Sequence, residues 1–161
     1  MHKISKALDA FSELTGNICS WFVAIMVLVT CVVVIMRYGL DMGSVLLQDV
    51  VLYLHGGLFL LGSAFALKRG AHVRVDIFYR DSSNSYKSNV NFILSLFFLL
   101  PVCFVIGFYS LELIEMSWKI REVSTEAGGL GYVYIQKTLI ILFPLTMILT
   151  FAYQLIHKKW K

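Results

Sequence analysis

Four long apolar runs constrain the fold of this chain most. They lie at about residues 18–36, 45–67, 90–111 and 135–156. Each approaches or exceeds the ~20 residues that an α-helix needs to cross a hydrocarbon core about 30 Å thick. The only formally charged residues within them are Asp49 and Lys137, each near the start of its run. Because backbone polar groups in lipid must be satisfied within the segment, the runs predict an all-α membrane protein with four transmembrane helices.

The composition supports a membrane protein over a soluble or nucleic-acid-binding one. Of the 161 residues, 58% are hydrophobic and only 15% are charged, which is more apolar than a soluble domain can present to water. The net charge of +4 does not indicate nucleic acid, because the Lys and Arg residues lie at the ends of the apolar runs. The three cysteines, Cys19, Cys31 and Cys103, lie inside those runs and are interpreted as small apolar residues.

The distribution of basic residues predicts the orientation. Ten Lys and Arg fall in the lead, the 68–89 loop and the tail, whereas four fall on the other side together with six acids. The positive-inside rule therefore places both termini and the 68–89 loop in the cytoplasm and the 112–134 loop in the periplasm. We expect one membrane domain over residues 1–161 in the inner membrane. Helix three should extend to about Val123 before a glycine turn.

The first 16 residues form a polar and amphipathic lead to the first run. Apolar residues on or near one side and charged residues on the others suit a short helix at the membrane interface, and a frayed tail is the alternative. The first run is too long for the hydrophobic core of a cleaved signal peptide and ends in Met36-Arg37-Tyr38 rather than in small residues. We expect it to remain as a helix.

The second run carries small and polar residues at seven-residue intervals. The residues that we expect in close helix packing, within the chain or against a partner, are Gln48, Asp49, His55, Gly56, Gly62, Ser63 and Ala66. This composition is typical of a helix packed closely against other protein. His55 is interpreted either as a neutral histidine bonded across a helix interface or as a proton-relay or substrate-binding group.

Polar residues near the ends of the runs suggest further contacts. Arg37 and Asp49 end helix one and open helix two on the same side, so an ion pair between them is plausible, with Gln48 as an alternative partner. In the fourth run, Thr138, Thr146, Thr150 and Gln154 can bond to neighbouring helices or, for the threonines, to their own helix.

The segment that follows helix two is strongly basic. Lys68 and Arg69 should end the helix at the cytoplasmic interface, close to lipid phosphate. His72, Arg74 and Asp76 then alternate with apolar residues, which is consistent with a lipid anchor or with a fixed hydrogen-bonded corner. A metal site is disfavoured, because two candidate ligands beside four cations make a poor cation site.

Enzymatic and stand-alone transport functions are poorly supported by these residues. Two alternatives stay open: a membrane redox or haem protein that uses His55 or Cys19 and Cys31, and a small multidrug-type exporter that works as a dimer. The runs contain only one histidine for haem and no charged residue at their centres for coupling ions. An accessory, non-enzymatic role without a cofactor is therefore favoured.

Two stretches carry a family resemblance. They read "MRYGLDMGSVLLQDVVLYLHGGLFLLGSAFALKRGAHVRVDIFY" (36–79) and "SWKIREVSTEAGGLGYVYIQKTLIILFP" (117–144). Both resemble the small membrane subunit, the DctQ-type subunit, of tripartite ATP-independent periplasmic (TRAP) transporters. The most specific parts are Arg37-Tyr38, Gln48-Asp49, the glycine-rich end of helix two and "RGAHVRVD".

The resemblance implies a division of labour among three proteins. A periplasmic binding protein would capture an organic acid, and a large DctM-type subunit would move it inward with a sodium gradient. The four-helix small subunit would brace the large one, in contact with membrane lipid and without sites for substrate or sodium. It also implies cytoplasmic termini, in agreement with the charge count.

Overall fold

The computed structural model of the protein describes residues 2–72 and 82–157. Its described elements are all helical: α1 (His2–Gly39), α2 (Val45–Arg69), α3 (Asn84–Leu94), the π-helical turn η2 (Ser95–Leu99), α4 (Leu100–Ile120) and α5 (Val133–His157). Four helices are long and apolar enough to cross a membrane, at Asp9–Gly39, Val45–Arg69, Asn84–Ile120 and Val133–Leu155. The prediction of an all-α protein with four membrane-spanning helices is confirmed.

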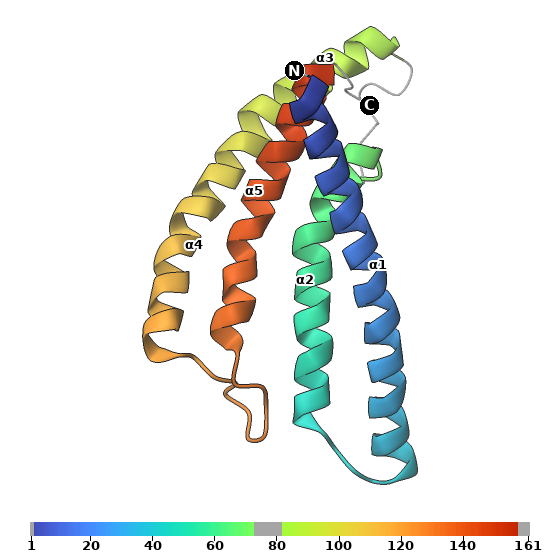
Figure 1. Ribbon diagram of the computed structural model, residues 1–161, viewed down its shortest axis with the longest axis vertical. Coiled ribbons are helices and arrows are strands. Elements are labelled where there is room, and N and C mark those ends of the chain that lie inside the picture. Colours follow the sequence, from blue (N-terminus) through green and yellow to red (C-terminus); the bar gives the residue numbers. More distant parts are fainter. Residues whose placement is uncertain (1, 73–81, 158–161) are drawn as a thin grey trace.

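The long helices lie side by side in the order α1, α2, α5, α4 (Figure 1). The start of α1, the end of α5 and α3 lie at one end of the molecule, which we call the terminal end. The connections at 40–44 and 121–132 lie at the opposite end, the loop end. The start of α1 and the end of α5 therefore share one side, and its assignment to the cytoplasm stays a prediction.

Helix α1 joins two segments that the sequence suggested as separate. It runs without a break for 38 residues, so the lead of residues 1–16 and the first span do not form two helices. No proline interrupts the junction, and Gly16 lies directly against the Phe65 ring of α2. The lead thus continues the α1–α2 contact beyond the predicted span, while its position in a membrane interface stays a prediction.

Helix α2 has a well-defined signal at each end. The Ser44 hydroxyl accepts a hydrogen bond from the Leu47 N–H at 3.4 Å, which satisfies one of the free donors of the first turn. At the other end Gly70 has φ = 66°, and its N–H and that of Ala71 bond to carbonyls of the last turn. Glycine is favoured here because this left-handed conformation strains other residues.

The third span is one continuous stretch formed by α3, η2 and α4. The π turn immediately precedes Leu100 and Pro101, and a proline lacks the N–H that the regular α-helical pattern needs. Helix α4 ends at Ile120 with Arg121 in the left-handed region, three residues before the predicted end. Its buried residues, Cys103, Ser110 and Ser117, recur every seven positions.

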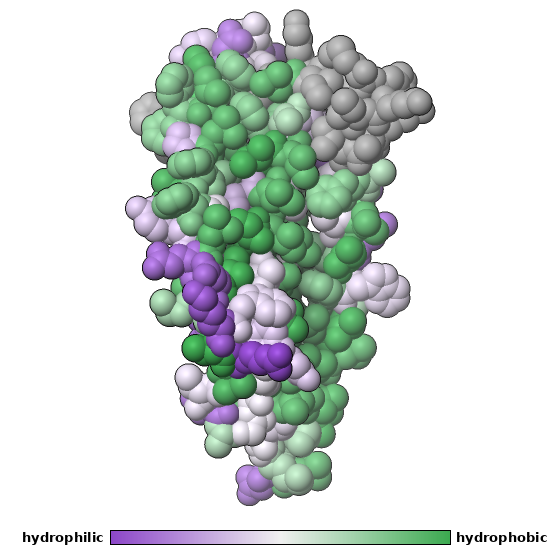
Figure 2. All heavy atoms as spheres, turned by 60° about the vertical axis from the view of Figure 1, so that its left-hand side comes forward, coloured by the Kyte–Doolittle hydropathy of each residue, from purple (hydrophilic) through white to green (hydrophobic). Residues whose placement is uncertain are grey.

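The core is small, as expected for a chain that lipid surrounds. Ala64, Cys103 and Met147 from three helices form the buried cluster. Large apolar side chains are instead exposed along the helices, and the side of the molecule that carries α4 is covered mainly by hydrophobic residues (Figure 2).

Candidate functional site

A charged junction joins α1 to α2 at the terminal end. The Lys68 ammonium lies 2.5 Å from the Asp9 carboxylate and 3.1 Å from the Glu13 carboxylate, and it also donates to the Asp9 carbonyl at 3.3 Å. The Lys68 side chain is only 10% exposed. This amine therefore binds α1, and it does not reach outward toward lipid phosphate as the sequence suggested.

Arg69 continues the same junction on its exposed side. Its guanidinium donates to both Glu13 carboxylate oxygens, at 3.1 and 2.9 Å, and lies 5.1 Å from the centre of the Phe65 ring. Asp9 and Glu13 are four residues apart and share one face of α1, so both can reach the end of α2. This spacing of two acids was a sequence signal for the junction. Sequence reasoning missed it because it placed the charged residues of the lead on the sides that face away from the protein.

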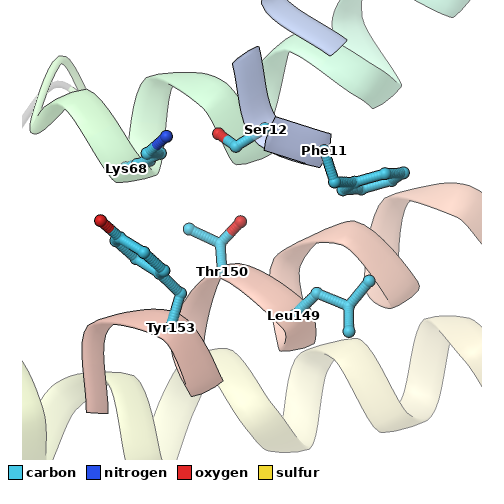
Figure 3. A pocket seen from close by; sticks show the side chains of 6 residues that line it. All are labelled: Phe11, Ser12, Lys68, Leu149, Thr150 and Tyr153. Carbon is cyan, nitrogen blue, oxygen red and sulfur yellow. The ribbon is translucent and has the colours of Figure 1, made fainter. Parts of the chain in front are cut away.

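Helix α5 completes the junction. The Gln154 amide, which is 6% exposed, donates to the Leu67 carbonyl of α2 at 3.1 Å. Lys68 lies over the Tyr153 ring at 5.4 Å. A cavity of about 10 Å³ remains between the three helices, with Ser12, Lys68 and Thr150 on its wall (Figure 3). This volume accommodates about one water molecule beside the buried Ser12 hydroxyl, which bonds to no other described residue.

The threonines of α5 do not tie helices together at this end. Thr146 and Thr150 donate to carbonyls of α5 itself, those of Phe143 and Thr146. The sequence allowed the threonines of the fourth run to bond either to neighbouring helices or to their own helix. Thr146 and Thr150 bond to their own helix, and Gln154 forms the bond between helices.

His72 forms a corner after α2. Its Nε2 lies 2.8 Å from the Ser63 carbonyl oxygen. Because a carbonyl can only accept, the ring nitrogen must be protonated to make this bond. The bond favours a fixed corner over a lipid anchor for His72, whereas Arg74 and Asp76 lie outside the described residues.

A second junction closes the loop end. The Asp49 carboxylate of α2 accepts a hydrogen bond from the Leu130 N–H at 2.8 Å. The loop folds back on itself here, since the Ser124 N–H donates to the Leu130 carbonyl at 3.1 Å. A Cβ at Gly129 would lie less than 3.0 Å from both Asp49 and Ser124, so this close approach requires glycine.

The expected ion pair between Arg37 and Asp49 is not formed. Within the described chain Asp49 faces the 124–130 segment, whereas Arg37 is exposed at the end of α1. The Leu130 N–H takes the place of the guanidinium as the partner of the carboxylate. Sequence reasoning missed this contact because residues 49 and 130 are far apart along the chain.

Two further contacts fix α4 and α5 near the loop end. Lys137 lies 2.5 Å from Glu122, both side chains being 29% exposed. The hydrogen bond from Lys137 holds the pKa of the Glu122 carboxyl below its usual value near 4.5. The Trp118 indole N–H donates to the Thr138 hydroxyl at 2.9 Å, and the Trp118 ring packs edge-on against Tyr134.

Glycines allow α2 to approach its neighbours closely. A Cβ at Gly62 would lie 3.5 Å from the Cys19 sulfur of α1, and a Cβ at Gly56 would lie 3.4 Å from the Gln136 amide nitrogen of α5. Among the glycines of α2 the tightest is Gly57, where a Cβ would lie 2.7 Å from the Phe22 ring. Sequence reasoning identified Gly56 and Gly62 but missed Gly57, which lies outside the seven-residue repeat.

The remaining residues of the α2 stripe divide between internal and exposed positions. The Ser63 hydroxyl donates to the Leu60 carbonyl of its own helix. The Ala66 carbonyl accepts hydrogen bonds from the Gly70 and Ala71 N–H groups at the end of the helix. Gln48 and His55 are exposed, and neither side chain forms a hydrogen bond within the part of the chain that the structure describes. Within the described chain only part of the predicted stripe is packed, and packing of Gln48 and His55 against a partner stays a prediction.

A metal centre is not assembled by these residues. Among residues 2–72 and 82–157, no group of three or more His, Cys, Asp or Glu side chains is placed to hold an ion. The ionisable side chains of the two junctions instead bond to one another and to backbone groups.

Comparison with known proteins gives one family match. Residues 26–159 match the family model described as tripartite ATP-independent periplasmic transporters, DctQ component. No match to this chain is found among curated proteins or among solved structures.

Proposed function

Because this chain belongs to the DctQ family of tripartite ATP-independent periplasmic transporters, we propose that it braces the large membrane subunit of such a transporter. The family membership makes it a small subunit of a transporter. Together with four helices able to span a membrane, it makes the protein a multi-pass protein of the bacterial inner membrane.

The observation that supports a brace is the pair of junctions at opposite ends of the helices. Lys68 and Arg69 hold α2 to α1 at the terminal end, and Asp49 holds the 124–130 segment at the loop end. Ties at both ends fix the spacing of the helices and oppose their relative sliding. A frame of this kind suits a subunit that keeps a moving partner in place.

The rest of the proposal concerns the assembly. DctQ proteins work with a DctM subunit and a substrate-binding protein. We infer that this chain contacts both, with residues 112–134 and the 37–45 connection facing the periplasmic protein. We further propose that the complex takes up an organic acid or a similar small solute with a sodium gradient. These points rest on the resemblance of residues 36–79 and 117–144 to small TRAP subunits.

Reconstitution tests this function. The chain, a DctM-type subunit and the binding protein from the same operon are placed in vesicles, and uptake of labelled organic acids is measured with sodium outside. Uptake should require all three proteins and should fall when choline replaces sodium. Full uptake without this chain would contradict a bracing role, and uptake or efflux driven by this chain alone would favour the exporter alternative. A haem spectrum of the purified chain would favour the redox alternative.

A further inference from the structure

We propose that one exposed face of α2 binds a transmembrane helix of the large subunit through hydrogen bonds to His55 and to the neighbouring Gln136. We call this surface the α2 polar face and define it by Gln48, Leu52, His55 and Phe59, with Gln136 of α5 beside it. The inference rests on the proposed function and adds which surface of this chain meets the partner.

The four α2 residues share one side of the helix. Their spacings of four, three and four residues place them in a single stripe along α2. All four are exposed, with Leu52 at 57% and Phe59 at 69%. Helix α1 contacts α2 at Gly57 and at Gly62, which lies seven residues after His55 and continues its side of the helix, and α5 contacts α2 at Gly56. The part of the stripe from Gln48 to Phe59 stays exposed in the described chain.

The depth of His55 makes a hydrocarbon environment unfavourable. His55 lies ten residues after the start of α2 and fourteen before its end, or about 15 and 21 Å along the helix axis. Ionisable and polar side chains inside a membrane face protein or a water-filled cavity and find partners there. The imidazole thus indicates protein contact at this depth.

Gln136 provides a second polar group at a similar level. Its amide nitrogen lies 3.4 Å from the position that a Gly56 Cβ would occupy, so the side chain contacts α2 at the residue that follows His55. The Gln136 side chain forms no hydrogen bond with any other residue of the described segments. Two neighbouring helices thus each carry a polar side chain without a hydrogen bond in the described chain, His55 on α2 and Gln136 against the adjacent Gly56.

The chemistry of these groups defines the partner surface. An imidazole and a primary amide can each offer a donor and an acceptor, so a Ser, Thr, Asn, Gln or protonated acid on the partner helix can bond to both. Leu52 and Phe59, one turn to either side, supply apolar contact around this centre. The occupant is therefore a transmembrane helix with a central polar side chain, and the large subunit is the membrane-spanning partner that the proposed function provides.

Two substitutions and a matched control test the polar contact. His55→Leu and Gln136→Leu should each lower the amount of large subunit recovered with this chain by roughly threefold to tenfold, which is the size of an interhelical hydrogen bond in a membrane. The isolated variants should melt at or above the temperature of the unsubstituted chain, because no internal bond is lost. Thr30→Val is the control, since Thr30 is exposed on α1 and, among the described residues, bonds only to the Met26 carbonyl of its own helix. It should leave recovery unchanged.

Photo-crosslinking identifies the occupant. A benzoylphenylalanine at position 52 or 59 should crosslink to the large subunit, and one at the exposed Leu28 of α1 should not. A crosslink between two copies of this chain would overturn the inference, as would lipid as the sole crosslinked partner at 52 and 59 while the complex remains intact. If the unsubstituted chain forms no complex at all, the proposed function fails. If the complex forms and both tests are negative, only the assignment of the α2 polar face fails.

Discussion

The Lys68 ammonium of α2 and the Asp9 carboxylate of α1 lie 2.5 Å apart, and the lysine side chain is almost fully enclosed. An enclosed ammonium needs a counter-charge, and Asp9 and Glu13 together supply it. The end of α2 is therefore attached to α1 at a point that precedes most of the first span.

Replacing this lysine should weaken the attachment. Lys68→Met keeps the apolar stem and removes the charge, which leaves Asp9 and Glu13 without this partner. We expect a loss of about 1–2 kcal/mol in the free energy of unfolding, between the values for exposed and buried pairs. Thermal melting in detergent measures it. Lys119→Met is the matched control, because the Lys119–Glu115 pair is exposed and within one helix, and an equal loss there would contradict the assignment.

Gly129 should be the least tolerant glycine of the loop end. Gly129→Ala would push a Cβ into Asp49 and Ser124, break the Asp49–Leu130 bond and cost about 1–3 kcal/mol. Limited proteolysis of the 121–132 connection, together with melting, would detect the opened loop. Gly43→Ala should change neither, since no atom lies within 4 Å of its added Cβ. Equal effects at both positions would show that the Asp49 contact is unimportant.

The Glu122–Lys137 pair should make stability sensitive to acid. The pKa of Glu122 is lowered in the folded protein, so the unfolded chain binds more protons between the folded pKa and the ordinary value near 4.5. The contribution of the pair is therefore present above pH 4.5 and is lost as the pH falls through the folded pKa. Melting temperatures from pH 7 to 3 should fall less steeply for Glu122→Gln than for the unsubstituted chain. Parallel profiles would contradict the pair.

Two glycines of α2 should respond differently to the same substitution. Gly57→Ala forces the Phe22 ring to move and should cost about 1–3 kcal/mol. Gly62→Ala places its methyl group 3.5 Å from Cys19, an ordinary contact, and should be neutral or slightly stabilising because alanine favours the helix. Urea or thermal unfolding of the two variants compares them directly. The reverse order would mean that α1 and α2 are packed differently.

The spans were predictable from sequence because hydrophobic length and the absence of central charges decide them locally. The partners of polar residues were not, because they depend on how distant segments fold together. Asp49 illustrates this, since its true partner is the Leu130 N–H rather than the nearby Arg37. Lys68 shows a different kind of error. The positive-inside rule led us to expect lipid phosphate as its partner, whereas its ammonium pairs with the carboxylates at positions 9 and 13.

The two helices of the α1–α2 hairpin also have matched lengths between the charges that join them and the loop end. From Glu13, which pairs with the end of α2, to Arg37 near the loop end, α1 has the same number of residues as α2, and each stretch spans about 37 Å. The charges that join the two helices prevent one from shifting along the other. A thinner or thicker bilayer would thus be accommodated by tilting the hairpin as a unit, and the tilt would pass directly to any protein held against α2.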